Sequence, residues 1–211
     1  MPRYIGRENL QKRLAPHEGE LGRTSYAQGA VTIELPDETL TVRPAFGLAH
    51  QGASDTVELG PLFEALAEDH VVAALLVRMG GFAVGVFEGE WLVVSKVGSR
   101  FVKGRHKKGG SSANRFRRRR EEQARALVEA AAATAAQVLE PHKARVEFAA
   151  LGGDRKAVED TLAVEPRLAW LAERALPRFF TTADPRLREL QRLPYELYSA
   201  ELQVEPRVSE L

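Results

Sequence analysis

The feature that most constrains how this chain can fold is an unbroken segment, Asn114–Leu139, that contains neither proline nor glycine and ends at Glu140-Pro141. As a helix it would be about 39 Å long, at 1.5 Å per residue. Apolar residues recur over its C-terminal two-thirds at spacings of three and four: Ala124, Leu127, Val128, Ala131, Ala135 and Val138. This spacing places them on one helix face, so the sequence predicts a long helix that packs on a core over most of its length.

The first turns of the predicted helix carry four consecutive arginines, Arg117–Arg120. Successive helical residues advance by about 100°, so these side chains point nearly all round the axis and a buried face cannot accept them. They also place cations at the positive end of the helix dipole, which is locally unfavourable. We therefore expect these turns to project beyond the body of the domain, and such a conflict between local preference and fold is typical of a functional site.

Charge is strongly segregated along the chain, although the formal net charge is only +1. Between Lys96 and Arg125 lie twelve basic and two acidic residues, which gives this segment a charge of +10. The rest of the chain has 18 basic and 27 acidic residues and carries −9. A basic segment this concentrated implies a polyanionic partner, and nucleic acid is the first candidate. A solvated helix start, with arginines paired to Glu121 and Glu122, is the simpler interpretation.

Composition excludes several classes of protein. The chain is 44% hydrophobic and 28% charged, which is typical of a folded domain, and it has no cysteine, which excludes disulfide scaffolds and iron–sulfur clusters. The sequence shows neither a membrane-spanning run nor a secretory signal, so we expect a cytoplasmic protein without a membrane partner. The five histidines lack ligand spacing, and we expect neither a metal site nor a cofactor: His17, His50, His70, His106 and His142.

The pattern predicts a mixed α/β domain over residues 63–195, with an N-terminal extension, 1–62, and an acidic tail, 196–211. In the extension we expect a short helix ending near Pro16 and a hairpin of Ala30–Leu35 with Thr39–Arg43. A further helix is expected at Pro61–Ala67, where proline suits the first turn.

Three β-rich runs with short glycine-containing links favour an antiparallel meander: Val71–Arg78, Phe82–Glu88 and Trp91–Val97. After the long helix we expect a strand at Ala144–Leu151, helices at Arg155–Leu162 and Arg167–Leu176, a strand at Arg178–Thr182 and a last helix to about Leu193. Strands and helices in this order form a layered domain.

Between the meander and the long helix, the glycine-rich segment Gly98–Ala113 is the best candidate for a functional loop. Gly109 and Gly110 allow close approach of backbone N–H groups to a ligand, and Ser111 and Ser112 then lead into the helix, so main-chain donors could meet a phosphate or a developing oxyanion. Gly104–Ser111 differs from a P-loop because Gly110 replaces the lysine, and a preceding meander does not suit that fold. A loop that binds phosphate without chemistry and a loop that acts on nucleic acid both remain open.

The basic loop and the arginine run together resemble the Vms-like release-factor family, which is related to the middle domain of archaeal and eukaryotic class-I release factors. The resemblance lies in Gly104–Ser112, in Arg115-Phe116 and in the arginine run that ends in Glu121-Glu122-Gln123. It implies a ribonuclease-H-like core and a ribosome-associated peptidyl-tRNA hydrolase that frees nascent chains from stalled large subunits. Its basic residues would contact ribosomal or transfer RNA: Lys103, Arg105, His106, Lys107, Lys108, Arg115, Arg117, Arg118, Arg119 and Arg120.

The resemblance also implies which residues would carry the chemistry. Gly109 and Gly110 match the family's glycine pair, but the family's glutamine shortly after them is replaced here by Ser111-Ser112-Ala113-Asn114. Backbone N–H groups of the serines, or the Asn114 amide, would have to act instead. Hence a catalytically inactive ribosome- or tRNA-binding factor is the alternative. Cleavage of the tRNA 3′ end is a third possibility, although no acidic cluster for two metal ions stands out.

Overall fold

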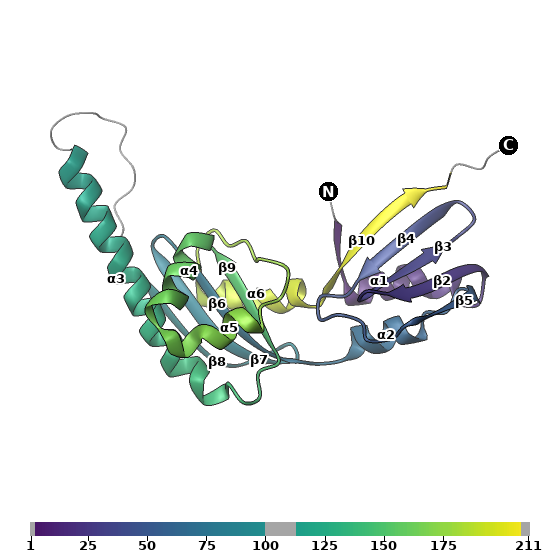
Figure 1. The fold of residues 1–211 in the computed structure, drawn as a ribbon, viewed down its shortest axis with the longest axis horizontal. Coiled ribbons are helices and arrows are strands. Elements are labelled where there is room, and N and C mark those ends of the chain that lie inside the picture. The colour runs from purple at the N-terminus through teal and green to yellow at the C-terminus, as the bar shows by residue number, and fades with distance from the viewer. Residues whose placement is uncertain (1–2, 100–112, 208–211) are drawn as a thin grey trace. The chain divides into compact units, whose positions relative to one another are not determined.

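The computed structural model describes residues 3–99 and 113–207, and the chain divides into two compact units (Figure 1). Residues 1–68 and 195–211 form the first unit, and residues 69–194 form the second. Both contain sheets and helices, so the mixed α+β class expected from the sequence is confirmed.

The first unit is an antiparallel sheet with strand order β1-β10-β4-β3-β2-β5 and two short helices. Its elements are β1 (Arg3–Gly6), α1 (Arg7–Leu14), the 3₁₀ turn η1 (Ala15–His17), β2 (Leu21–Ala27), β3 (Ala30–Glu34), β4 (Glu38–Arg43), β5 (Gly52–Thr56), α2 (Gly60–Ala67) and β10 (Ser199–Pro206). The predicted hairpin is β3 with β4, where Val31 lies opposite Val42. Both helices pack on the sheet through buried leucines, Leu10 and Leu14 from α1 and Leu62 and Leu66 from α2.

The segment predicted as an acidic tail differs in the structure, because Ser199–Pro206 form strand β10 between β1 and β4. Ala200 and Leu202 are buried, whereas Glu201 is half-buried and Gln203 is exposed. This alternation is the period of a strand with one face on a core. The acidic composition of this segment did not indicate a strand, and the strands with which it pairs come from the other end of the sequence.

The second unit contains a sheet of order β8-β7-β6-β9, in which β6, β7 and β8 are antiparallel and β9 runs parallel to β6. Its elements are β6 (Val71–Arg78), β7 (Gly81–Glu88), β8 (Trp91–Ser99), α3 (Ala113–Leu139), the turn η2 (Glu140–His142), β9 (Phe148–Gly153), α4 (Arg155–Val164), the turn η3 (Pro166–Leu168) and α5 (Ala169–Glu173). Helix α6 (Leu187–Leu197) begins in this unit and ends in the first. The predicted meander and long helix are confirmed.

One face of this sheet supports the helices that position α3. Leu127, Ala131 and Ala135 of α3 share a buried core with strand residues such as Val84 and Val86, and α4 and α5 contribute Val158 and Leu171. The predicted helix face is therefore buried over its central part, while Ala124 and Val138 at its two ends are only half-buried. The layered arrangement follows from this shared core.

Two expected elements of this unit differ in the structure. Arg178–Thr182 form no strand, and their backbone pairs with the sheet at the isolated bridge Gly152–Phe180. Pro177 precedes the segment and lacks a backbone donor, which works against a continuous ladder. Strand β9 starts at Phe148, later than expected, because the N–H groups of Arg145 and Val146 donate to the His142 carbonyl in a turn.

Candidate nucleic-acid interface

The glycine-rich loop lies between the end of β8, which is closely packed, and the start of α3. Ser99, the last residue of β8, lies opposite Gly81, and Gly98 lies opposite Phe82. A Cβ added to Gly98 would be 2.3 Å from Phe82 Cζ, so the buried Phe82 ring occupies the space above this glycine. This close packing of the Phe82 ring on the backbone of Gly98 fixes the position of the end of β8, from which the chain enters the glycine-rich loop.

The first half of α3 extends beyond the sheet that supports its second half (Figure 1). The helix begins at Ala113 and its first fully buried side chain in the described range is Leu127. Fourteen residues separate the two positions, which at 1.5 Å each corresponds to about 21 Å of helix. The prediction that the arginine-bearing turns project from the domain is therefore confirmed.

The described arginines of these turns face solvent. Arg115, Arg118 and Arg119 are exposed and Arg120 is half-buried. Among the described side chains, no carboxylate lies within 4 Å of these four guanidinium groups. Within the described residues, these four arginines are therefore not neutralised by Glu121 or Glu122.

The other predicted site residues are placed only in part. Asn114 and Arg117 lie in α3, but their side chains are outside the described set. The loop residues lie outside the described residues altogether: Lys103, Arg105, His106, Lys107, Lys108, Gly109, Gly110, Ser111 and Ser112. Gln123 lies within α3, nearly three turns beyond the helix start.

Two exposed cations extend the interface and were not among the predicted site residues. Lys96 lies on β8, three residues before the strand ends, and Arg125 lies on α3, after the arginine run. Both lie in the segment of charge +10, so a count of charges along the sequence includes them. The loop motif does not include them.

The opposite end of this sheet differs in its electrostatics, because its charged groups pair within the protein. Arg145 pairs with Glu88, and the His70 ring lies 3.0 Å from Glu147. Burial raises the pKa of Glu147, but the donated Val71 N–H and the His70 ring outweigh it and hold that pKa below its usual value. An open cleft of about 440 Å³ lies here, lined in part by Asp69 and the exposed Trp91.

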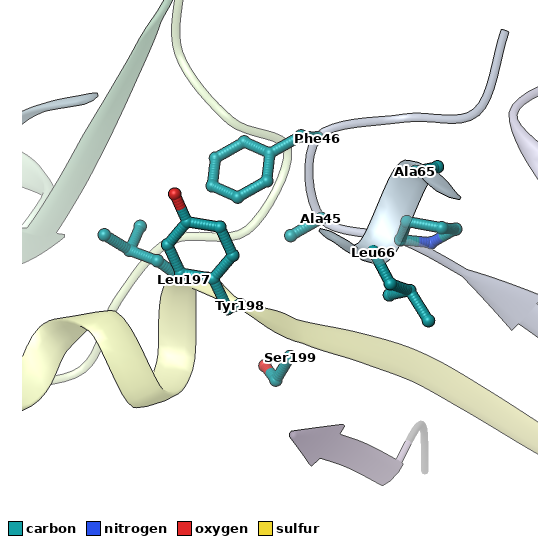
Figure 2. A pocket seen from close by; sticks show the side chains of 8 residues that line it. Ala45, Phe46, Ala65, Leu66, Leu197, Tyr198 and Ser199 are labelled. Atoms are coloured by element: carbon teal, nitrogen blue, oxygen red, sulfur yellow. The ribbon is translucent and has the colours of Figure 1, made fainter. Parts of the chain in front are cut away.

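The first unit contains a small apolar pocket beside Tyr198 and Leu66 (Figure 2). Its volume is about 10 Å³, which holds a water molecule at most. The Phe46 and Tyr198 rings lie 5.1 Å apart, and the Arg7 guanidinium lies 4.4 Å from the centre of the Tyr198 ring. These contacts stabilise the unit, and the pocket is too small for a cofactor.

Residues 3–99 and 113–207 contain no group of three or more histidine and acidic side chains arranged to hold a metal ion. Within the same ranges, no helix combines the length and the apolar composition needed to cross a bilayer.

Residues 70–203 match the family described as Actinobacteria/chloroflexi VLRF1 release factor. The matched range includes the whole sheet of the second unit, together with the basic segment and α3, and omits only Asp69, the first residue of that unit. No curated protein matches this chain.

Several solved structures are similar to this chain at low sequence identity. An archaeal translation termination factor, aRF1, is 14% identical over 76% of this chain and 49% of its own, with a TM-score of 0.42. The Vms1 mitochondrial localization core is 14% identical over 95% of this chain and 82% of its own, with a TM-score of 0.40. Pelota of Archaeoglobus fulgidus is 10% identical over 88% of this chain and 59% of its own, with a TM-score of 0.35. The present chain thus spans about half the length of the archaeal termination factor.

Proposed function

Because this chain belongs to the Actinobacteria/chloroflexi VLRF1 release-factor family, we propose that it binds the large ribosomal subunit and releases stalled nascent chains by hydrolysing peptidyl-tRNA. Family membership confirms the resemblance that the basic loop and arginine run suggest. The proposal is that the chain binds cytoplasmic ribosomes, that peptidyl-tRNA is its substrate and that hydrolysis is its reaction.

The observation that carries the proposal is the exposed, arginine-bearing start of α3. About 21 Å of helix precedes the first described buried side chain, and it presents Arg115, Arg118 and Arg119 to solvent. Arginine binds phosphate through paired in-plane donors, and many such contacts give strong RNA affinity. A narrow cationic projection suits a partner whose own site is deep, as the peptidyl-transferase centre is.

In the proposed reaction, water adds to the ester carbonyl that joins the peptide to the tRNA. The carbon–oxygen bond to the tRNA 3′ oxygen then breaks, and the proton from water passes to that oxygen. Backbone N–H groups at Ser111 and Ser112, or the Asn114 amide, would stabilise charge on the carbonyl oxygen, while Gly109 and Gly110 would let the backbone approach the tRNA end. The ribosome would exclude bulk water and align the ester.

The test is a release assay on large subunits that carry stalled peptidyl-tRNA. Saturating protein should free the peptide and leave a tRNA with an intact 3′ end. Substituting Gly109 and Gly110 by alanine should abolish release with little loss of subunit binding, whereas Gly104→Ala in the same loop should retain it. Absence of release by the unaltered protein would defeat the hydrolase proposal, and a shortened tRNA would indicate RNA cleavage instead.

One observation favours a second function, a catalytically inactive RNA-binding factor. Ser111-Ser112-Ala113-Asn114 occupy the positions at which the resemblance implies a glutamine. An inactive factor would bind the large subunit with a steep dependence on salt but would leave peptidyl-tRNA intact. The glycine substitutions would then change nothing measurable, which separates the two functions.

A further inference from the structure

The open cleft at the end of the sheet opposite to the basic segment is built from directly paired residues of three strands. Val71 of β6 lies opposite Glu88 of β7, and Glu88 lies opposite Trp91 of β8. Side chains of directly opposite residues point to the same face of a sheet, with Cβ atoms about 5 Å apart. The three residues line the cleft of about 440 Å³ together with four others of the second unit: Asp69, His70, Gly89 and Arg145. The cleft is therefore one continuous surface.

Contacts within the protein fix the shape of this cleft. The Gly89 N–H donates to the His70 carbonyl over 3.0 Å, which ties the turn between β7 and β8 to the chain just before β6. Gly89 has a φ of +58°, and a Cβ added there would lie 2.9 Å from the Asp69 carboxyl group, so glycine lets this carboxyl group lie against the turn. Glu147 accepts the Val71 N–H over 2.9 Å and lies 3.0 Å from the His70 ring. The cleft is thus formed before any ligand binds.

The exposed Trp91 ring is the feature of the cleft that contacts within the protein do not explain. Its exposed fraction is 81%, whereas Trp170, the other tryptophan of the chain, is 4% exposed and donates from Nε1 to Glu140. Among the described residues, no aromatic ring or guanidinium group stacks on Trp91. Tryptophan is the aromatic side chain that binds cations best, and tryptophan is enriched where proteins meet. The Trp91 ring therefore indicates a binding surface.

The charge around the cleft is negative, in contrast to the +10 of the basic segment. Four carboxylates lie in the cleft or directly beside it: Asp69, Glu88, Glu90 and Glu147. With Arg145 as the cation of the lining and His70 neutral, these four give a formal charge of −3. Pairing of Arg145 with Glu88 leaves this sum unchanged. A phosphate is therefore repelled from the cleft, and a cation is attracted to it.

We propose that this cleft binds an arginine side chain from an extended, basic segment of a partner protein. The guanidinium plane stacks on the Trp91 ring, and its edge donates to the carboxylates around the cleft. Lysine offers a point charge without that plane, and RNA offers phosphates that the negative charge disfavours. The inference goes beyond the proposed function, because it assigns a protein-binding site to the end of the sheet opposite to the candidate nucleic-acid interface.

Binding is tested with the full-length protein and a short peptide of alternating glycine and arginine. Acrylamide quenching of tryptophan fluorescence reports on Trp91, because Trp170 is buried. We expect the peptide to protect Trp91 from acrylamide, and this protection should weaken as the salt concentration rises. A peptide with citrulline in place of arginine keeps the size of the side chain but loses its charge, so it should give no protection.

Matched variants separate the contributions of the ring and of the charge, with affinities measured by NMR titration and folding checked by thermal unfolding. Trp91→Ala should bind the arginine peptide roughly fivefold more weakly. Met79→Ala, which truncates an exposed apolar side chain at the other end of the sheet, should bind it normally. Trp91→Phe keeps a ring and should lose less affinity, so it also serves if the alanine variant unfolds. Glu88→Gln should weaken binding roughly threefold, whereas Glu129→Gln, at an exposed position of α3, should not.

Equal binding by Trp91→Ala and Met79→Ala, or no protection of Trp91 by the arginine peptide, would overturn the inference. Protection by an oligouridylate but not by the peptide would show that the cleft contacts RNA, and would overturn it as well. None of these measurements uses ribosomes or peptidyl-tRNA. Failure of the release assay would therefore leave this inference standing, and failure of peptide binding would leave the proposed function standing.

Discussion

The two halves of α3 belong to one continuous helix but follow opposite rules. Its second half places Leu127, Ala131 and Ala135 in the core, with small side chains that let the helix lie close to the sheet. Its first half presents arginines to solvent, and among the described residues Arg118 and Arg119 have no carboxylate partner. Packing accounts for the second half, whereas nothing within the described fold accounts for the first. Substitutions in the first half should therefore change binding, and those in the second half should change stability.

Placing an arginine in the buried half of α3 should give the largest effect on stability. Ala131 is fully buried against the sheet, so Ala131→Arg forces a long charged side chain into a packed core. We expect a loss of about 4 kcal/mol or more in the free energy of unfolding, enough to unfold many domains of this size. The matched control is Ala133→Arg, two residues away on the exposed face, which should stay within about 0.5 kcal/mol. Denaturant unfolding measures both, and similar stabilities would mean that α3 is not packed as described.

The converse substitution tests the first half. R118E/R119E reverses two exposed charges and should weaken binding to large subunits by roughly a hundredfold at low salt. The free energy of unfolding should not fall, because acidic residues suit the positive end of a helix dipole. Binding assays and denaturant unfolding on the same samples give both values. A large loss of stability would show that these arginines have a structural role after all.

A smaller effect is expected where β8 enters the basic segment. Gly98→Ala would place a methyl group 2.3 Å from the far end of the buried Phe82 ring, which must then move. We expect a loss of about 1–2 kcal/mol in the free energy of unfolding, as is usual for overpacking. Gly60→Ala, at a position where an added Cβ meets nothing within 4 Å, is the control. Equal behaviour would show that Phe82 does not anchor the end of β8.

Elements formed by local patterns could be predicted from the sequence, and those that depend on distant partners could not. The strands of the meander and helix α3 have clear periods and short connections, so their positions follow from neighbouring residues. Strand β10 was missed because β1 and β4, which flank it, lie nearly 200 and about 160 residues away in the sequence. Its acidic residues also favour a solvated segment when the sequence is considered alone.

The same distinction applies to the candidate site. The basic loop and Arg115–Arg120 form one run and are visible in a count of charges along the sequence. Lys96 and Arg125 belong to the same run of charge but lie outside the loop motif, and the structure is needed to show that both side chains are exposed on β8 and α3.

The smallest predicted effect concerns pH and contrasts the two ends of the sheet. Arginines hold their charge throughout the accessible range, so their part of RNA binding should not vary with pH. Glu147 does titrate, and its pKa is held below the usual 4.5, because the Val71 N–H and the His70 ring outweigh the effect of burial. The stabilisation it provides is complete above 4.5 and is lost as the pH falls through the lowered value, since the unfolded state then binds the proton first. The side chain is 48% exposed, so solvent screening limits the contribution to about 0.5 kcal/mol. Glu147→Gln should lower the free energy of unfolding by that amount at pH 7, and the difference from the unaltered protein should shrink as the pH falls below 4.5. A difference that stays constant as the pH falls would show that the Glu147 charge is not its source.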